Sequence, residues 1–437
     1  MNLEIQLERK EAVVKEDGST KPILNSFVLP VMEYARSSGL LSIVESHLHI
    51  KMKTVKYSWQ DKVRELMCSI VSGCDHTVTI NHKLVPDTTL AGEIIQKDRF
   101  ADQSGINRLL HSLTDENLAE LETIFAEDYM RHGVAGKLPR NETVFVDLDM
   151  SGFRADGKTY EGTAKGYVGH PGSKGYKASF AYVQAQREVI GCIFDKGSVN
   201  INSHIDPLLE LVKRRIGSPK VRDIVIRGDA AFGNSTIVNK CIDGGYLFLF
   251  RGWHVNTARK YSKRIKEWVK IEKDNQEELY AGEFRGKIFG SDHRMRVIVF
   301  KSFRHNGKIE YFHLLTNLPD ILYPLQVMFD LYHDRQGIEA YFKSEKSGLH
   351  LKNLRTRNLI GIKAFVLLSC ITHNMMVHAL SSFGRIVKKG FIGIRAFVEK
   401  LACSKGWFSR KGSDSLLLLF TLENPTIKQY INCTLGT

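Results

Sequence analysis

The spacing of the apolar residues changes near residue 142. Upstream of that position they recur at the 3.6-residue period of helices, as in residues 59–73. In residues 143–151 they alternate with polar residues, which predicts a β-strand with Asp147 and Asp149 on one face. Two strands, a helix, a strand, a helix and a strand are then predicted in turn, over residues 176–184, 187–195, 205–216, 221–231, 234–243 and 245–252. This order predicts a mixed sheet with helices packed on it.

The same order is that of a ribonuclease H-like core, apart from its final helix. That helix is expected only from about Leu325, because a basic region with a predicted hairpin at Asn306-Gly307 comes first. We therefore expect an α/β fold: a ribonuclease H-like catalytic core interrupted by a β-rich insertion, with a helical N-terminal domain and a helical C-terminal region. The expected domains are 1–138 (N-terminal, DNA-binding), 139–251 (first part of the core), 252–322 (insertion), 323–380 (final core helices) and 381–437 (basic C-terminal region).

The net charge restricts the class of partner. The 437 residues include 62 Lys and Arg against 48 Asp and Glu, which gives a formal charge of +14 and a pI near 9.3. Such an excess favours a polyanionic partner, with nucleic acid ahead of an anionic membrane surface. The most apolar run, residues 359–371, is too short to span a bilayer and contains Lys363, so we interpret it as a core helix and expect no membrane partner.

The N-terminus and the cysteines indicate the compartment. The first 18 residues are charged throughout and lack the apolar segment of a signal peptide. The seven cysteines are odd in number and form no CxxC pair, which favours a reduced protein without structural zinc. A cytoplasmic location is therefore expected.

Residues 332–346 combine charged and phenolic side chains in one helical register. Tyr332, Arg335, Glu339 and Lys346 are separated by three, four and seven residues, so on one α-helix they would lie within an arc of roughly 60°. Such a row beside the core would suit phosphate contacts, because Arg binds phosphate in a bidentate manner and Lys is a compact cation. An ordinary solvated face is the alternative, since Arg335 and Glu339 also have the i,i+4 spacing of an intrahelical ion pair.

Three carboxylates come from elements that this fold would bring together. Asp149 is expected at the end of the first strand, Asp229 at the end of the fourth, and Glu339 on the final helix. Carboxylates at strand ends face the crevice where open sheets bind ligands. Oxygen ligands from several elements suit a pair of Mg²⁺ or Mn²⁺ ions that cleave a phosphodiester. The three acids are thus candidate catalytic residues and metal ligands, with Asp147 as the second choice for the first ligand.

With these residues the chain resembles a bacterial insertion-sequence transposase of the DDE class, from the cut-and-paste group with the signature Tyr-x2-Arg-x3-Glu-x6-Lys. Tyr332, Arg335, Glu339 and Lys346 match that signature at every spacing. Further similarity to the group lies in residues 149–151, 157–167, 227–232 and 314–320.

The resemblance implies a metal-dependent DNA transposase. Proteins of this kind bind the terminal inverted repeats of their element, pair the two ends as a homodimer, cleave the double-stranded DNA and join the freed 3′-OH ends to target DNA. Some relatives resolve the second strand through a hairpin. For this chain the resemblance implies that Asp149, Asp229 and Glu339 hold two Mg²⁺ or Mn²⁺ ions.

The chain departs from the group at three positions. Ser151 stands where Thr is common, and Ala230 and Ala231 stand where small polar residues are frequent. The three acids are intact, so activity is expected, and a catalytically inactive DNA-binding derivative of a transposase is the alternative. A hydrolase that acts on sugars fits the paired carboxylates, but it does not fit the positive charge or the phosphate-suited cations.

Two further regions are candidate DNA contacts. Residues 89–113 predict two short helices around a turn, with Ser104 as N-cap of the second, and either a helix-turn-helix or an ordinary helical pair fits them. Residues 253–274 contain seven Lys or Arg against three acids, with Trp253, Tyr261 and Trp268 interleaved. Backbone contact with an aromatic stacked on a displaced base is one interpretation, and a solvated face is the other.

Overall fold

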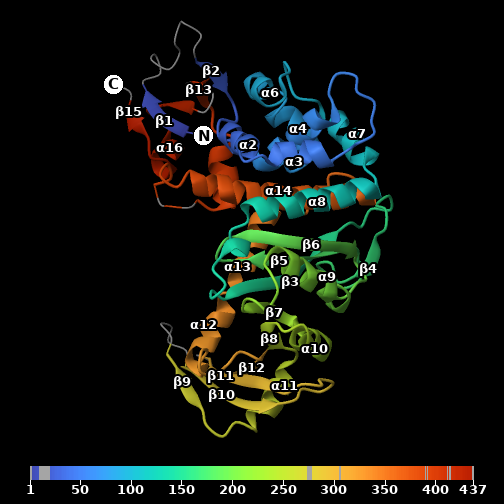
Figure 1. Ribbon diagram of the computed structural model, residues 1–437, viewed down its shortest axis with the longest axis vertical. Helices are drawn as coiled ribbons and strands as arrows, with labels where there is room; N and C mark the ends of the chain where they lie inside the picture. Colours follow the sequence, from blue (N-terminus) through green and yellow to red (C-terminus); the bar gives the residue numbers. More distant parts are fainter. Residues whose placement is uncertain are drawn as a thin grey trace. The chain divides into compact units, whose positions relative to one another are not determined.

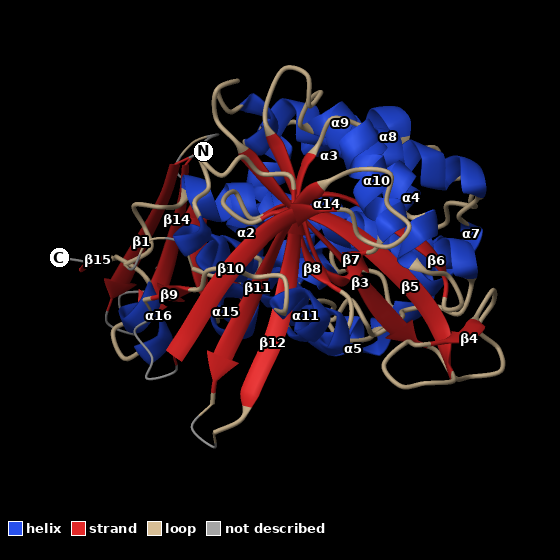
Figure 2. Ribbon diagram, turned by 90° about the horizontal axis from the view of Figure 1, so that it is seen from below, coloured by secondary structure: helices blue, strands red, loops and turns tan. Residues whose placement is uncertain are grey.

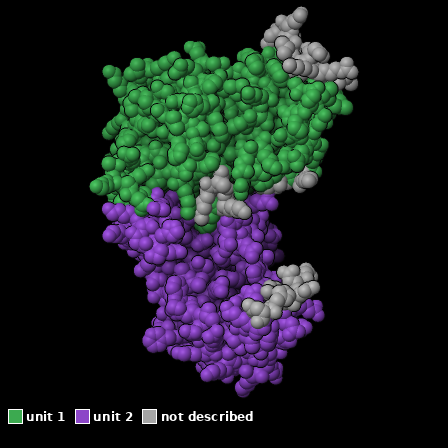
Figure 3. Space-filling view, turned by 180° about the vertical axis from the view of Figure 1, so that it is seen from behind, with its two compact units in different colours: residues 1–133, 155–163, 342–437 green, residues 134–154, 164–341 purple. Residues whose placement is uncertain are grey.

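The chain is divided into two compact units. The computed structural model describes residues 2–8, 20–272, 278–304, 307–388, 390, 392–410, 412 and 415–435, without the side chains of residues 343–347. Unit 1 is formed by residues 1–133, 155–163 and 342–437, and unit 2 by residues 134–154 and 164–341 (Figure 3). Each unit is therefore assembled from segments that are far apart in sequence.

Unit 2 is built on a ten-stranded sheet. The strand order is β4-β5-β3-β7-β8-β12-β11-β10-β9, with β6 paired to β5. The strands are β3 (Val144–Arg154), β4 (Ala164–Gly166), β5 (Ser173–Val183), β6 (Glu188–Lys196), β7 (Ile224–Gly233), β8 (Leu247–Gly252), β9 (Val269–Ile271), β10 (Glu278–Gly286), β11 (Met295–Phe303) and β12 (Ile309–Thr316). They fan out in Figure 2, as expected of a strongly twisted sheet. All five strands predicted between residues 143 and 252 are confirmed.

Helices pack on this sheet where the sequence predicts them. The helix α9 (Ile205–Arg215) packs on β5 and β6, and α10 (Ser235–Asp243) packs on β7 and β8. The side chain of Asn234 caps α10, because its Oδ1 accepts a hydrogen bond from the backbone N of Ile237 at 3.2 Å. A further helix, α11 (Val255–Ser262), packs on β11 and β12. Short 3₁₀ turns occur at η1 (Ala135–Lys137), η2 (Ile201–Ser203) and η3 (Leu325–Val327).

The β-rich region at residues 252–322 continues the core sheet. Its last strand, β12, pairs antiparallel with β8, and Thr316 lies opposite Leu249. Its strands share one buried cluster with β7 and β8, to which Val225, Ile298 and Phe300 belong. The region between β8 and the final core helices is thus rich in strands, as expected of the insertion, and burial of a common apolar face joins these strands to the core sheet. The predicted β11–β12 hairpin is confirmed, although Asn306 at its turn lies outside the described residues.

The final helix of the core is broken in two. The structure has α12 (Met328–His333) and α13 (Gln336–Ser347), with a turn at Asp334 and Arg335 between them. The prediction that residues 332–346 form one helical row is therefore wrong, and Tyr332 and Glu339 lie on different helices. Here the backbone N of Arg335 donates to the carbonyl of Tyr332 at 3.1 Å, an i→i+3 bond instead of the α-helical one.

Unit 1 is helical around one long buried helix, α14 (Leu359–Ser382). The helix packs against α2 (Val28–Ser37), α4 (Trp59–Val71), α7 (Gln103–Ser112) and α8 (Asp115–His132). Within the described part of the chain, α14 is the one helix long and apolar enough to cross a membrane, and 89% of its most apolar window is buried inside the protein. The expected core helix at residues 359–371 is thus confirmed. The other helices are α3 (Leu40–His47), α5 (Thr77–Lys83), α6 (Thr88–Ile95), α15 (Ile394–Phe397) and α16 (Pro425–Tyr430), with a π-helical turn, η4 (Val398–Ala402).

A five-stranded sheet in unit 1 joins the two ends of the chain. Its order is β15-β1-β14-β13-β2, and the N- and C-terminal strands lie together in Figure 1. The strands are β1 (Asn2–Glu8), β2 (Lys21–Ile23), β13 (Gly406–Arg410), β14 (Ser415–Thr421) and β15 (Thr434–Leu435). The expectation of a helical C-terminal region is therefore wrong, because the apolar run of β14 pairs with β1 over seven residues.

The predicted pair of short helices in residues 89–113 is confirmed as α6 and α7. The predicted cap is wrong: Asp102, not Ser104, is the N-cap of α7, and its carboxylate accepts a hydrogen bond from the backbone N of Gly105 at 3.0 Å. Ser104 instead donates its hydroxyl to that carboxylate at 2.6 Å. A charged acceptor at the N-cap is the stronger partner for the free amides of a first turn.

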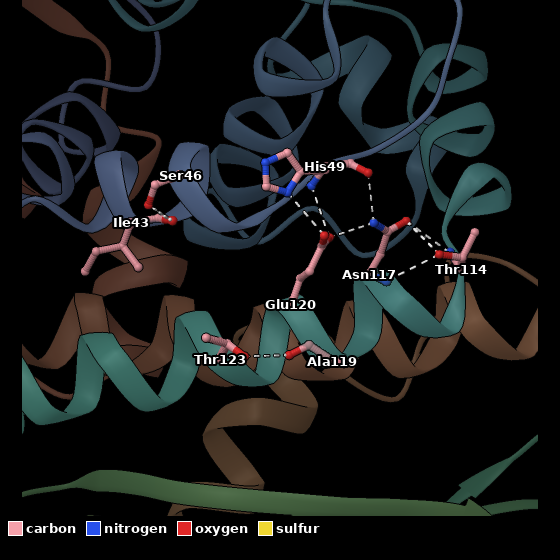
Figure 4. Close-up of polar contacts among 8 residues, drawn as sticks. All are labelled: Ile43, Ser46, His49, Thr114, Asn117, Ala119, Glu120 and Thr123. Atoms are coloured by element: carbon pink, nitrogen blue, oxygen red, sulfur yellow. Dashed lines mark hydrogen bonds and ion pairs between the residues drawn. The ribbon is translucent and has the colours of Figure 1, made fainter.

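The start of α8 anchors the segment that follows α3 (Figure 4). Thr114 and Asn117 form a capping box at this end of α8. The side chain of Asn117 also donates to the carbonyl of His49 at 3.1 Å and to Glu120 at 2.8 Å. Glu120 in turn accepts the backbone N–H of His49 at 3.0 Å. One helix end therefore holds both its own first turn and a neighbouring loop.

Replacing Glu65 with Gln is expected to flatten the pH dependence of unit 1 stability. Glu65 is fully buried on α4, and burial raises the pKa of its carboxyl to about 9. Between pH 4.5 and 9 the folded protein therefore holds a proton that the unfolded chain releases, so stability falls as the pH rises. The Gln variant can still accept the hydrogen bond from the backbone N of Ala101. Its free energy of unfolding relative to that of the wild type is expected to be about 1–3 kcal/mol more favourable at pH 8 than at pH 5.

Denaturant unfolding of the wild type and the variant at both pH values checks this. Glu116→Gln, an exposed change on α8, is the control and should leave the pH dependence as it is in the wild type. If the free energies of unfolding of the wild type and Glu65→Gln changed equally between the two pH values, the prediction would be contradicted.

Candidate active site

Asp149 and Asp229 lie on adjacent strands of unit 2. The strands β3 and β7 run parallel, and their pairing ends with Leu148 opposite Gly228. Each aspartate follows directly on this last pair. The register offset of 80 residues (228 − 148) is also the separation of the two aspartates (229 − 149). The sheet register therefore brings two carboxylates side by side where the parallel ladder stops.

The expectation that both aspartates end their strands is wrong. The strand β3 continues to Arg154, because its second half pairs antiparallel with β5. The strand β7 continues to Gly233, and its register with β8 shifts after Gly228. The parallel pairing of β3 with β7 therefore stops just before Asp149 and Asp229, and these two strands are not paired with each other beyond that point.

The two carboxylates repel each other. The side chain of Asp149 is 20% exposed, and burial raises the pKa of its carboxyl to about 6, with a further increase from the charge of Asp229. Its Oδ1 accepts the backbone N–H of Met150 at 2.7 Å, and Oδ1 of Asp229 accepts the backbone N–H of Ala231 at 2.9 Å. The site thus concentrates negative charge at low solvent exposure.

Arg335 connects Asp149 to Glu339. Only 7% of Arg335 is exposed, and its Nη1 lies 3.8 Å from Oδ2 of Asp149. Its Nη2 donates to Oε1 of Glu339 at 2.8 Å. Burial acts to lower the pKa of Arg335, but Tyr332, both aspartates and Glu339 outweigh burial and raise it. The i,i+4 ion pair expected of a solvated face is present, yet its arginine is buried against the two aspartates.

The remaining signature residues are placed as follows. Tyr332 lies in the last turn of α12 with its ring 5.9 Å from the guanidinium of Arg335, and burial raises the pKa of its hydroxyl. The side chain of Glu339 is 60% exposed on the first turn of α13. The side chain of Lys346 lies outside the described residues. The structure therefore brings together the three acids, Tyr332 and Arg335, from two strands, two helices and the turn between these helices.

The three acids suit a divalent metal ion by their chemistry. Carboxylate oxygens are the ligands that Mg²⁺ and Mn²⁺ prefer. The mutual repulsion of Asp149 and Asp229 would be relieved by a divalent cation between them. In the part of the chain that the structure describes, no three His, Cys, Asp or Glu side chains are arranged at the spacing of a metal site. In the structure, the positive charge of Arg335 partly offsets the negative charges of Asp149 and Glu339.

Asp147, the second choice for a metal ligand, is committed to another partner. Its carboxylate is fully buried and accepts two hydrogen bonds from the guanidinium of Arg227, at 2.6 and 2.9 Å. Burial raises the pKa of Asp147 to about 6, and the charge of Arg227 opposes this increase. Asp147 is therefore not open to a cation. Arg227 was not predicted from the sequence as part of the site, although its separation of 80 residues from Asp147 equals that of Asp229 from Asp149.

A family model described as "Transposase DDE domain group 1" matches residues 18–383. The chain belongs to this family of DDE transposases. The match includes both aspartates and Glu339. No curated protein matches this DDE transposase family member.

Two solved structures of transposases are similar to this family member. One is the piggyBac transposase synaptic complex with hairpin DNA, at 12% identity and a TM-score of 0.47, covering 88% of this chain and 81% of the other. The second is the Mos1 transposase paired-end complex with the left transposon end, at 12% identity and a TM-score of 0.16, covering 46% of this chain and 60% of the other.

DNA cleavage by this DDE transposase family member is expected to fall about tenfold per pH unit below pH 6. Protonation of Asp149 removes its charge, and its raised pKa places this loss near pH 6 instead of pH 4. Rates measured from pH 5 to 8 check this, with end binding at each pH as the control. Because a cation and a proton would compete for the carboxylate, the midpoint should move to lower pH as Mn²⁺ is raised. A rate that is constant down to pH 5 at low Mn²⁺ would contradict the prediction.

Proposed function

We propose that the protein is a DNA transposase of the cut-and-paste type, which binds the terminal inverted repeats of a bacterial insertion sequence, cleaves DNA with two divalent metal ions and joins 3′-OH ends to target DNA. The observation that carries the proposal is the register of β3 and β7, which sets Asp149 beside Asp229 while Arg335 links Asp149 to Glu339. The strand order β6-β5-β3-β7-β8, with β3, β7 and β8 parallel, supports a ribonuclease H-like core.

Each residue has a role in this proposal. Asp149, Asp229 and Glu339 would hold the metal ions, which when bound would supply Lewis-acid stabilisation of the reacting phosphodiester. Arg335 orients Asp149 and Glu339, and its Nη1, which is buried without a hydrogen-bond partner among the described residues, is a donor for a phosphate oxygen. The ring of Tyr332 packs against the face of the Arg335 guanidinium. Water attacks the scissile phosphodiester first, and the freed 3′-OH attacks the target at the same site.

A basic and aromatic pocket beside Tyr332 supports DNA as the substrate. The pocket has a volume of about 490 Å³ and lies between α11, α12 and the β11–β12 hairpin. Arg251, Arg259, Arg304 and Lys308 line it together with Tyr332 and other aromatic residues, and Glu310 in the same lining forms ion pairs with Arg304 and Lys308. Cations with aromatic faces suit the phosphates and bases of a DNA strand. Trp253, which is 50% exposed, precedes α11 in the same basic region.

Cleavage of a labelled DNA duplex tests the proposal. The duplex carries the inverted repeat that flanks the coding region, and it is incubated with Mg²⁺, Mn²⁺ or EDTA and either wild type or Glu339→Gln. We expect metal-dependent cleavage by the wild type, and none by the variant although it still binds the DNA. Glu210→Gln, an exposed change on α9, is the matched control and should cleave normally.

The second candidate function is an end-binding protein without catalysis. The departures at Ser151, Ala230 and Ala231 favour it, because they alter hydrogen bonding around the acids. Binding of the repeat by the wild type without cleavage under either metal would establish this candidate and overturn the first.

The proposal also includes the assembly and location of the protein. Two copies pair two DNA ends as a homodimer in the bacterial cytoplasm. Mass photometry with and without the end DNA checks this, and a complex with one protein copy per end that never pairs would contradict it.

A further inference from the structure

Arg227 is a buried arginine that joins three elements of unit 2. It is 2% exposed on β7, two residues before Asp229. Its Nε and Nη2 donate to the two carboxylate oxygens of Asp147 on β3, at 2.6 and 2.9 Å. Its Nη1 donates to the carbonyl of Leu331 on α12 at 2.8 Å. The face of its guanidinium lies 5.1 Å from the ring of Phe145.

The Arg227–Asp147 ion pair lies directly behind the two catalytic aspartates in the sheet. Arg227 and Asp147 are opposite each other in the β3–β7 register. Side chains two residues apart on a strand share a face, so Asp149 and Asp229 follow on the same side of the sheet. The ion pair thus fixes the register of the two strands one step before the metal-binding carboxylates.

The third contact of Arg227 falls at the break between α12 and α13. In a continuous helix the carbonyl of Leu331 would accept from the backbone N of Arg335. In the structure the backbone N of Arg335 donates to the carbonyl of Tyr332 instead, and the carbonyl of Leu331 accepts a hydrogen bond from Nη1 of Arg227. Arg227 therefore caps α12 at its C-terminus and stabilises the turn that aims Arg335 at Asp149.

A second link runs from Arg227 to α13 through Gln184. The Nη2 of Arg227 lies 3.4 Å from Oε1 of Gln184, in the turn between β5 and β6. A Cβ added at Gly337 on α13 would lie 2.3 Å from the Gln184 side chain, so the helix approaches this side chain as closely as a glycine allows. The helix that carries Glu339 is thus held against the same network.

We propose that Arg227 is a positioning residue, which sets the strands of Asp149 and Asp229 and the helix of Glu339 in the geometry that binds metal. The inference rests on the proposed function, because it concerns the metal site of that reaction. Arg227 does not touch the reacting atoms. Arg227 acts by fixing the β3–β7 register and the end of α12. Asp147 holds the guanidinium of Arg227 in the orientation that these contacts need.

Iron-mediated cleavage of the protein itself tests the positioning role. Fe²⁺ replaces Mg²⁺, and with hydrogen peroxide as oxidant and ascorbate to reduce the resulting Fe³⁺ it cuts the polypeptide next to the bound ion. In the wild type we expect cuts near residues 149, 229 and 339. In Arg227→Met/Asp147→Leu, which leaves no unpaired buried charge, we expect the cut near 339 to lose intensity at least about fivefold relative to the other two. DNA cleavage should fall about 10- to 100-fold in kcat with KM for DNA unchanged.

Arg227→Lys covers the case in which the double variant does not fold. Lysine keeps the charge opposite Asp147 but cannot bond Asp147 and the Leu331 carbonyl in the same geometry. We expect it to show the same change in the iron cuts to a smaller degree.

The Arg296–Glu283 pair supplies a matched control. Arg296 on β11 is 1% exposed, donates to Glu283 at 2.7 Å and to the carbonyls of Leu318 and Tyr323 at 3.0 Å, so it too is a buried arginine that joins a carboxylate to backbone carbonyls. Two strands, β8 and β12, lie between β11 and β7 in the sheet. Arg296→Met/Glu283→Leu should leave the pattern of iron cuts unchanged.

The outcomes separate the inference from the proposed function. Variants of Arg227 that fold and retain the wild-type ratio of cuts, with DNA cleavage within twofold of wild type, would overturn the positioning role alone. A wild type that shows no iron cuts near the three acids and no DNA cleavage would overturn the metal function, and the inference with it.

Discussion

An Asp229→Asn variant is expected to cleave its DNA end at least about 10³-fold more slowly than the wild type, a loss of about 4 kcal/mol in transition-state stabilisation. Asparagine removes the negative charge that lies beside Asp149 and leaves one carboxylate fewer for the metal ions. The rate of strand cleavage on a labelled end, measured in single-turnover conditions at pH 8, checks this.

The same variant should fold at least as well as the wild type. The charge of Asp229 raises the pKa of Asp149, so its removal relieves a repulsion in the folded state. Thermal unfolding without metal is therefore expected to show an equal or higher midpoint. Asp223→Asn, an exposed change just before β7, is the control for both measurements. Cleavage by Asp229→Asn within tenfold of wild type would contradict the assignment of this residue as a metal ligand.

Arg335→Lys is expected to lower the cleavage rate about 10²-fold, or about 3 kcal/mol, although the charge is kept. Two different nitrogens of Arg335 face Asp149 and Glu339, at 3.8 and 2.8 Å. A single ammonium cannot hold both carboxylates and also donate to a phosphate oxygen. The loss should appear in kcat with end binding retained, as measured by single-turnover cleavage and by gel shift.

Arg285→Lys is the matched control for this substitution. Arg285 forms an ion pair with Asp320 at 3.2 Å, and both side chains are more than half exposed. Exposed pairs contribute little, so cleavage and stability should remain within the error of the wild type. If Arg335→Lys behaved like this control, the buried guanidinium would have no catalytic role.

The succession of strands and helices along residues 143–252 and the two aspartates could be predicted from the sequence, because both depend on local patterns. Alternating apolar residues define β3 and β7, and a carboxylate within each run is visible without any knowledge of the partner strand. The exact position of these acids could not be predicted. Asp149 and Asp229 lie where parallel pairing stops, and that point is set by the antiparallel partner of β3 and the shifted register of β7.

The break between α12 and α13 could not be predicted from local sequence. Neither Asp334 nor Arg335 is a residue that ends helices by itself. The break depends on two contacts distant in sequence: Arg227 takes the Leu331 carbonyl, and Arg335 turns toward Asp149. The spacing of Tyr332, Arg335 and Glu339 therefore indicated residues that the structure brings together, although the single helix assumed for them was wrong.

The pairing of the N-terminal strand β1 with β14 near the C-terminus could not be predicted either, because it too depends on residues distant in sequence. The strand β1 reads as a short alternating run, and nothing near it indicates that its partner is β14. Likewise, the match of β12 to β8 follows from a shared buried cluster and not from a signal in either strand. Pairings between distant strands are decided by packing, which a local pattern does not contain.

The pairing of β1 with β14 also sets an order of events during synthesis. Asn2 lies opposite Ser415, so the ribosome must add 413 further residues (415 − 2) before the first strand has its partner. At about 5–20 residues per second the N-terminal strand waits roughly 20–80 s. Closing a loop of this length costs about 5 kcal/mol of chain entropy, which only the completed sheet can offset. A ribosome that stops before residue 415 therefore releases a chain in which Leu3, Ile5 and Leu7, all buried in the folded protein, lie on a strand without its partner.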